Sequence, residues 1–208
     1  MGWPVLAPPV AAQSAVSTST LEPRILVVGD SLSAEYGLQR GTGWVALLEK
    51  QLKAEHVVHQ IINASVSGDT TSGGRSRLPS LLLRHRPSHV VIELGGNDAL
   101  RGLPLSMTES NLAAMVQAAT QTKARVTLVG MQVPPNYGPT YARDFSGLYT
   151  KVAQAHKAAL VPFLLKGVAD GPQAADLFQA DRIHPNESAQ AAMLANVWPV
   201  LRPQLGKP

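Results

Sequence analysis

Short runs of valine, isoleucine and leucine alternate with longer amphipathic segments from residue 24 onward. This alternation constrains the fold more than any other feature of the sequence. The short runs lack the polar alternate positions of half-exposed strands, as is typical of strands covered on both faces. The predicted strands are Ile25–Val28, Val57–Ile62, His89–Leu94, Val126–Gly130 and Ala159–Phe163. The predicted helices are Trp44–Ala54, Arg77–Arg86, Glu109–Lys123, Tyr141–His156 and about Glu187–Leu201.

Strands joined by helices form right-handed crossovers and therefore a parallel sheet with helices on both faces. We predict one α/β domain, residues 24–208, built as a three-layer α/β/α sandwich with a five-stranded parallel sheet. The expected strand order is the flavodoxin-like 2-1-3-4-5. Because such sheets bind ligands beyond the carboxyl ends of their strands, the loops after the first three strands are the candidate site.

The composition restricts the classes of function. The 208 residues are 45% apolar and 15% charged, as in ordinary soluble globular proteins. Lys and Arg outnumber Asp and Glu by only 18 to 14, so we expect no nucleic-acid partner. The chain has no cysteine, which excludes disulfides, thiolate metal sites and a cysteine nucleophile. No apolar run approaches the roughly 20 residues that span a bilayer, so we predict no stable membrane insertion. We also expect the protein to be a monomer.

Residues 1–23 differ from the rest of the chain. They contain four prolines and a Ser/Thr cluster, carry no Lys or Arg, and resist assignment to a helix or strand. The small residues at 10–12 resemble the end of a secretory signal, although the basic start of such a signal is missing. We interpret the segment as a flexible leader or the remnant of an export signal, and predict a periplasmic or secreted protein. An artificial leader is the alternative.

The first predicted strand ends in the sequence Gly-Asp-Ser-Leu-Ser at 29–33. If the chain turns into a helix here, the hydroxyl of Ser31 lies near the positive end of that helix, which favours developing alkoxide character. This placement suits a nucleophile. The alternative is that Asp30 and Ser31 only cap the helix that follows.

The loops after the second and third strands combine glycines with small polar residues. Gly68 lets backbone N–H groups approach a ligand closely, and no Lys follows in the arrangement of a P-loop. Gly95 and Gly96 allow a backbone path that aims the Asn97 amide toward the same edge. A neutral amide donor is well suited to an oxyanion. The structural alternative is a pair of turns whose helices are capped by Asp69, Thr70 or Asp98.

Asp181 and His184 stand three residues apart in Asp-Arg-Ile-His-Pro, near the C-terminus. At this spacing the carboxylate can bond one ring nitrogen and fix the tautomer, which leaves the other nitrogen free to take a proton from a serine. A surface salt bridge is the alternative. The other histidines have no partners at metal-ligand spacing, so we predict no metal site.

Taken together, the blocks at 29–33, 67–70, 95–98 and 181–185 resemble, in order, the signature blocks of the GDSL or SGNH hydrolases. Within that superfamily the chain looks most like the branch of thioesterase I, lysophospholipase and arylesterase. Further support comes from Arg-Leu-Pro at 77–79, from 93–102, and from Pro-Pro-Asn-Tyr-Gly at 134–138. The resemblance extends from Ile25 to about Val200. The G-x-S-x-G elbow of α/β-hydrolases is absent around Ser31.

The resemblance implies a serine esterase that hydrolyses carboxylic esters and thioesters, such as acyl-CoA, lysophospholipid and aryl esters, through an acyl-enzyme. Ser31 would be the nucleophile, His184 the general base and then acid, and Asp181 the orienting carboxylate. The oxyanion hole would comprise the N–H groups of Ser31 and Gly68 and the side chain of Asn97. No cofactor or metal is implied, and the partner is a small-molecule or lipid ester.

The residues that bind the substrate are predicted from weaker patterns than the catalytic residues. Pro134 and Tyr137 are candidates for the wall of an acyl-chain groove, with ordinary loop packing as the alternative. Gly73 and Gly74 are candidates to make the loop after Gly68 mobile, or else form a simple turn. A solvated helix face is the favoured interpretation of four arginines: Arg75, Arg77, Arg84 and Arg86. Two rival functions stay open, a short-chain carbohydrate deacetylase on the same scaffold and, less favoured, a non-catalytic anion-binding module.

Overall fold

A computed structural model describes residues 22–206 and contains one five-stranded parallel sheet in the order β2-β1-β3-β4-β5. The predicted fold class and strand order are confirmed. The strands are β1 (Arg24–Gly29), β2 (Gln60–Asn63), β3 (His89–Glu93), β4 (Arg125–Val129) and β5 (Ala159–Val161).

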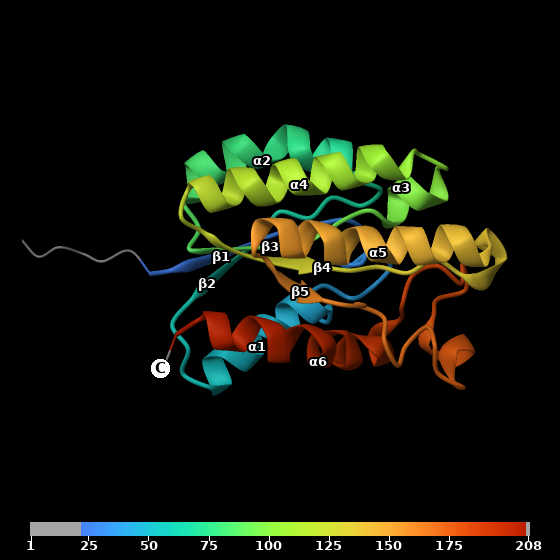
Figure 1. The fold of residues 1–208 in the computed structure, drawn as a ribbon. Coiled ribbons are helices and arrows are strands. Elements are labelled where there is room, and N and C mark those ends of the chain that lie inside the picture. Colours follow the sequence, from blue (N-terminus) through green and yellow to red (C-terminus); the bar gives the residue numbers. More distant parts are fainter. Residues whose placement is uncertain (1–21, 207–208) are drawn as a thin grey trace, which may run out of the picture.

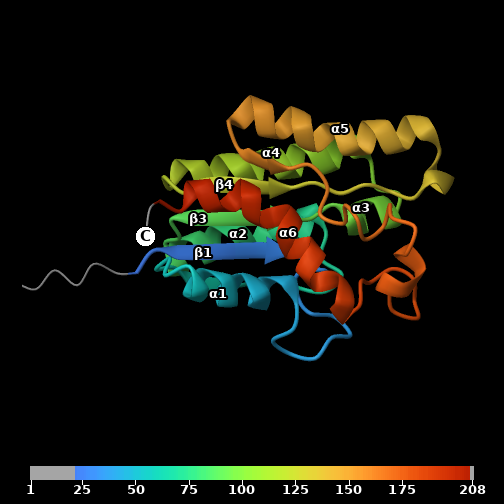
Figure 2. The same ribbon diagram turned by 90° about the horizontal axis from the view of Figure 1, so that it is seen from below.

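Helices cover both faces of the sheet. They are α1 (Trp44–Ala54), α2 (Thr71–His85), α3 (Gly96–Leu100), α4 (Leu105–Gln121), α5 (Pro139–His156) and α6 (Gln190–Leu201). In Figures 1 and 2, α1 and α6 lie together on one face, while α2, α4 and α5 cover the other. None of the helices in the described part of the chain combines the length and hydrophobicity that crossing a bilayer requires.

The two central strands form the middle of the core. Ile25 to Val28 in β1 and Val90 to Ile92 in β3 are completely buried, and Val27 pairs with Val91 in register. Because both faces are covered, an apolar side chain is favourable at every one of these positions. This arrangement fixes the carboxyl ends of β1 and β3 side by side, where Gly29 pairs with Glu93.

The chain after β1 differs from the sequence-based expectation. Residues 31–37 form consecutive turns, and the next helix, α1, begins only at Trp44. The expectation that a helix terminus lies at Ser31 is therefore wrong. The turn is stabilised instead by Asp30, whose carboxylate accepts a hydrogen bond from the Leu32 N–H at 3.0 Å and whose carbonyl accepts one from the Ala34 N–H at 2.9 Å.

The boundaries of α2 and β2 also differ from the prediction. β2 begins at Gln60 rather than Val57, and α2 begins at Thr71 rather than Arg77. Thr70 caps α2, since its Oγ1 accepts from the Gly73 N–H at 3.3 Å. Gly73 and Gly74 consequently lie in the first turn of a helix, and the interpretation of a mobile loop is wrong. A side chain on Gly73 would collide with the Asp69 carboxylate, and one on Gly74 would collide with Leu94.

The predicted leader, residues 1–23, lies outside the described residues except for its last two positions. The Pro23 carbonyl accepts a hydrogen bond from the Gln60 N–H at 2.9 Å, beside the start of β1.

Candidate active site

Ser31, His184 and Asp181 form a continuous chain of hydrogen bonds. Ser31 Oγ lies 2.9 Å from His184 Nε2, and His184 Nδ1 lies 2.6 Å from Asp181 Oδ2. The serine comes from the turn after β1, whereas the other two residues come from the segment before α6, about 150 positions later. The structure thus brings together the three residues predicted to act as a triad. The ring of Tyr36 packs on His184, with the ring centroids 4.4 Å apart.

Asp181 is held by its own turn. Its Oδ1 accepts the N–H groups of Ile183 at 2.9 Å and His184 at 3.0 Å, while Arg182 adopts the left-handed backbone conformation between them. The backbone and side-chain hydrogen bonds from His184 lower the pKa of the Asp181 carboxyl to about 2. Asp181 is therefore ionised at neutral pH, and its Oδ2 holds His184 with a proton on Nδ1 and a lone pair on the Nε2 that faces Ser31.

The backbone N–H groups of Ser31 and Gly68 are available to a ligand. Neither donates a hydrogen bond to an acceptor within residues 22–206. Gly68 has φ +78°, a conformation that L side chains rarely adopt, and its carbonyl accepts a hydrogen bond from Arg101 at 2.8 Å. Two unpaired donors in the loops after β1 and β2 are what an oxyanion hole requires.

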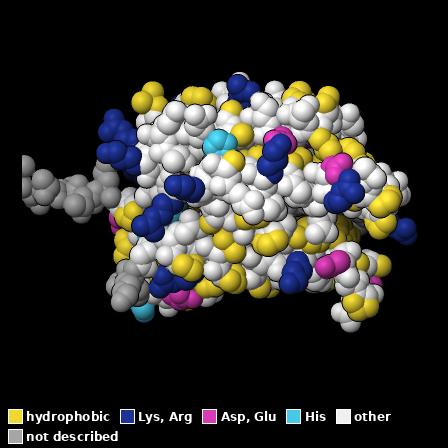
Figure 3. Space-filling view, viewed as in Figure 1, with side chains coloured by type: hydrophobic (Ala, Val, Ile, Leu, Met, Phe, Trp, Pro, Cys, Tyr) yellow, Lys and Arg dark blue, Asp and Glu magenta, His cyan; other side chains and the backbone are white. Residues whose placement is uncertain are grey.

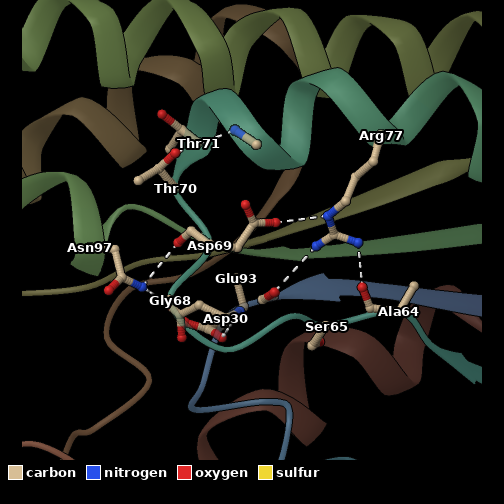
Figure 4. Close-up of polar contacts among 12 residues, drawn as sticks. Asp30, Ala64, Ser65, Gly68, Asp69, Thr70, Thr71, Arg77, Glu93 and Asn97 are labelled. Atoms are coloured by element: carbon tan, nitrogen blue, oxygen red, sulfur yellow. Dashed lines mark hydrogen bonds and ion pairs between the residues drawn. The ribbon is translucent and has the colours of Figure 1, made fainter.

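Asn97, the third predicted donor, is engaged on both of its N–H groups. Its Nδ2 donates to Asp30 Oδ2 at 3.0 Å and to the Asp69 carbonyl at 2.9 Å (Figure 4). Gly95, at φ +120°, makes the turn that places Asn97 here, and a side chain on it would collide with the hydroxyl of Tyr149. Asn97 therefore bridges the two loops that carry Ser31 and Gly68, and it can donate to a substrate oxygen only by sharing or exchanging one of these bonds.

Two buried acids lie directly behind the loop that carries Ser31, and sequence reasoning missed their role. Asp30 is 2% exposed and Glu93 is completely buried. Glu93 Oε2 accepts from Ser33 Oγ at 2.7 Å and from the Asp30 N–H at 3.4 Å. Burial raises the pKa of Asp30 to about 6 and raises the pKa of Glu93 well above its usual value, where the charge of Asp30 adds to the effect. The sequence did contain one signal for this role, because Glu93 places a carboxylate at the end of a strand whose preceding three residues are apolar.

Asp98 has a structural role, but a different one from the predicted cap of the short helix α3. Its completely buried carboxylate accepts from the Thr71 N–H at 2.8 Å, from the Thr71 hydroxyl, and from Thr108 Oγ1 at 3.3 Å. Asp98 thereby joins the start of α2 to α4. This connection fixes the helix that follows the Gly68 loop.

The two candidate groove residues lie in the loop after β4. Pro134 is exposed, and Tyr137 is half-buried with its ring stacked on Tyr141 at a centroid distance of 5.7 Å. Tyr141 in turn stacks on Phe145 of α5. Tyr137 thus has a packing partner in the fold, and its contact with substrate stays a prediction. Within residues 22–206, no group of three or more His, Asp or Glu side chains is arranged to hold a metal ion.

Comparison with known proteins agrees with this geometry. Residues 27–192 match the model of the GDSL-like Lipase/Acylhydrolase family. The chain belongs to this family. It is 53% identical over 181 residues to esterase TesA of Pseudomonas aeruginosa, a match that covers 87% of this chain and 89% of the relative.

Two further relatives have lower sequence identity, but the matches again cover most of both chains. The chain is 40% identical to an arylesterase of Vibrio mimicus, over 84% of this chain and 86% of the relative. It is also 40% identical to thioesterase 1/protease 1/lysophospholipase L1 of Escherichia coli K12, over 80% of this chain and 77% of the relative. The crystal structure of TesA superimposes with a TM-score of 0.84 at 51% identity, covering 87% of this chain and 99% of that one. The chain is a carboxylic ester hydrolase.

Proposed function

We propose that the protein hydrolyses esters and thioesters in two steps through an acyl-enzyme on Ser31. The observation that carries this proposal is the unbroken series from Ser31 Oγ through the His184 ring to the Asp181 carboxylate. His184 Nε2 takes the hydroxyl proton as Ser31 attacks the acyl carbonyl, and then gives it to the leaving alcohol or thiol. A water molecule, deprotonated by the same nitrogen, releases the acid and restores Ser31.

The negative charge that develops on the carbonyl oxygen is stabilised by the unpaired N–H groups of Ser31 and Gly68. Asn97 supplies the third donor as its bond to Asp30 or Asp69 lengthens. Asp181 stays ionised throughout and stabilises the imidazolium of His184.

Apolar side chains around the site support a hydrophobic acyl or aryl group. Of the large hydrophobic side chains that are exposed in residues 22–206, four lie in segments that carry site residues, and each is half exposed or more: Tyr36, Val66, Leu100 and Ile183. We call these four residues the apolar rim. Covering exposed apolar area with an apolar ligand lowers the free energy of binding. The rim therefore favours medium or long acyl chains over acetyl. With the names of the relatives, this makes acyl-CoA, lysophospholipid and aryl esters the proposed substrates.

A nucleic-acid partner is not part of this proposal. On the face shown in Figure 3, Lys and Arg side chains lie in several separate places, some of them beside Asp or Glu. A periplasmic or secreted location is proposed from residues 1–23 alone. N-terminal sequencing of the protein from its native host tests this location, and an intact Met1 on the mature protein contradicts it.

A panel of p-nitrophenyl esters from acetyl to palmitoyl, together with palmitoyl-CoA and a lysophosphatidylcholine, tests the proposal. We expect a maximum at medium or long chains for the wild type, no turnover by Ser31→Ala, and full turnover by the control Ser76→Ala on the exposed side of α2. An alkyl phosphonate should label the wild type once per chain and leave Ser31→Ala unlabelled. A preference restricted to acetyl esters would instead indicate a deacetylase, and turnover by Ser31→Ala would overturn the triad.

A further inference from the structure

The guanidinium of Arg77, on the second turn of α2, bonds three acceptors in two segments at the carboxyl ends of β1 and β2 (Figure 4). Nε pairs with Asp69 Oδ2 at 2.7 Å, one terminal nitrogen donates to the Ala64 carbonyl, and the other donates to the Gly29 carbonyl at 3.3 Å. Its side chain is 23% exposed, and that of Asp69 is 11% exposed. The sequence-based interpretation of Arg77 as part of a solvated helix face is therefore wrong.

The three acceptors are placed around the proposed oxyanion hole. Gly29 is the last residue of β1, two positions before Ser31, and Ala64 directly follows β2. Asp69 directly follows Gly68, and its carbonyl also accepts a hydrogen bond from Asn97. One planar guanidinium thus connects the segments that carry Ser31 and Gly68, and Asn97 is joined to them through the Asp69 carbonyl.

The surroundings of Asp69 show that this pair is built into the fold. Gly73 leaves open the space that the Asp69 carboxylate occupies, since a side chain there would collide with Asp69 Oδ1. Hydrogen bonds between ionised partners that are largely excluded from water are shorter and stronger than those between neutral groups. A lysine in place of Arg77 could pair with Asp69 as a point charge but lacks the rigid fork that reaches the two carbonyls.

We propose that Arg77 is a positioning residue that fixes the distance between the Gly68 N–H and the nucleophile Ser31. The inference rests on the proposed acyl-enzyme mechanism and adds to it the side chain that aligns its oxyanion hole. Hydrogen-bond donors stabilise a developing charge only when they are held within about 0.5 Å of the productive geometry. Since Arg77 does not touch the substrate, losing it should weaken binding of the transition state far more than binding of the substrate.

The test compares Arg77→Lys and Arg77→Ala with Arg84→Lys, a control at an exposed position further along α2. For a p-nitrophenyl ester we expect kcat to fall by about 10- to 10²-fold in Arg77→Lys, with KM changed less than about threefold. A trifluoromethyl ketone, which forms a tetrahedral adduct with an oxyanion, should lose affinity by the same factor as kcat. Arg84→Lys should match the wild type in both measurements.

Chemical rescue separates positioning from folding. Millimolar methylguanidinium should restore part of the kcat of Arg77→Ala, whereas methylammonium at the same concentration should not. If Arg77→Ala does not fold, Gly73→Ala supplies a second variant, because it displaces Asp69 while leaving Arg77 in place. We expect it to show the same selective loss of kcat.

The proposal is overturned if a folded Arg77→Lys keeps kcat and ketone affinity within about twofold of the wild type. It is equally overturned if kcat and KM deteriorate together in proportion to lost thermal stability, since that result indicates a purely structural role. Failure of the underlying mechanism is distinguishable, because it would appear as turnover by Ser31→Ala whatever the Arg77 variants do.

Discussion

The Asn97 amide donates to the carboxylate of Asp30 across 3.0 Å, and this bond joins the loop after β3 to the residue that precedes Ser31. The second N–H of the same amide donates to the Asp69 carbonyl, next to Gly68. Asn97 is thus fixed by both of the loops that carry the other two proposed oxyanion donors, the N–H groups of Ser31 and Gly68. The two bonds hold the amide in place before the oxyanion forms, and one of them must lengthen or be shared when Asn97 donates to the substrate oxygen.

Asn97→Ala should lower kcat by about 10²- to 10³-fold, as removal of one oxyanion donor does in other hydrolases. KM should change little, because the lost bond forms only in the transition state. Steady-state kinetics on a medium-chain ester measures both values, and circular dichroism checks that the variant is folded. An unchanged kcat in a folded variant removes Asn97 from the oxyanion hole and leaves it a purely structural bridge.

His184→Ala should lower kcat by at least about 10³-fold without unfolding the protein, since the ring is partly exposed and, within residues 22–206, bonds only to Ser31 and Asp181. The pH profile of the wild type carries a second expectation. Activity should fall in acid because the base must be a neutral imidazole. The pKa of Asp181, at about 2, lies too low to add a further acidic limb above about pH 3. Titration of the Asp181 carboxyl between pH 4 and 7, followed by NMR, would contradict this assignment.

The difference between what the sequence predicted and what it missed has a physical cause. Strand order follows from rules that act along the chain, namely burial of apolar runs and right-handed crossovers between parallel strands. The meeting of Ser31, Asp181 and His184 is expected from the resemblance to the GDSL hydrolases. The roles of Arg77 and Glu93 depend on which carbonyls and hydroxyls surround one side chain after folding. Arg77 is one of several arginines on its helix, and only its contacts with Asp69 and two carbonyls distinguish it.

The same limit applies to helix boundaries and to the loop after β1. The start of α2 at Thr71 depends on the threonine cap and on the bond from its N–H to Asp98, a residue 27 positions later. Ser31 needs no helix behind it, because the turn that carries it is also held by the bond from Ser33 Oγ to Glu93, a residue 60 positions later. Local propensity does not contain either long-range contact.

Ile183→Ala tests the apolar rim. Ile183 is 50% exposed and directly precedes His184, so shortening it removes apolar area from the rim without opening a cavity in the core. We expect kcat/KM for a decanoyl ester to fall by about three- to tenfold and that for an acetyl ester to stay constant. Val58→Ala is the matched control, since Val58 is 62% exposed but precedes β2 at the opposite end of the strand. Equal losses on both esters would argue against a role of the rim in chain-length selection.

Glu93→Gln should make stability less dependent on pH. A folded-state pKa above the unfolded value means that protonation favours the folded protein: for Asp30 this contribution is present below about pH 4 and is lost as the pH rises through about 6. Glu93 acts in the same direction, because its pKa is also raised by burial. The glutamine keeps an acceptor for Ser33 and the Asp30 N–H, and it replaces Oε1, which has no hydrogen-bond partner within residues 22–206.

We therefore expect the Tm of Glu93→Gln to exceed that of the wild type at pH 8, by roughly 2–4 °C for each kcal/mol of relieved charge burial, and to approach it at pH 4. Differential scanning calorimetry at both pH values measures the difference. Glu49→Gln, at a half-exposed position on α1, controls for the loss of one negative charge and should leave the pH dependence unchanged. A Tm that depends on pH as steeply in Glu93→Gln as in the wild type would show that Glu93 does not take up a proton in this range.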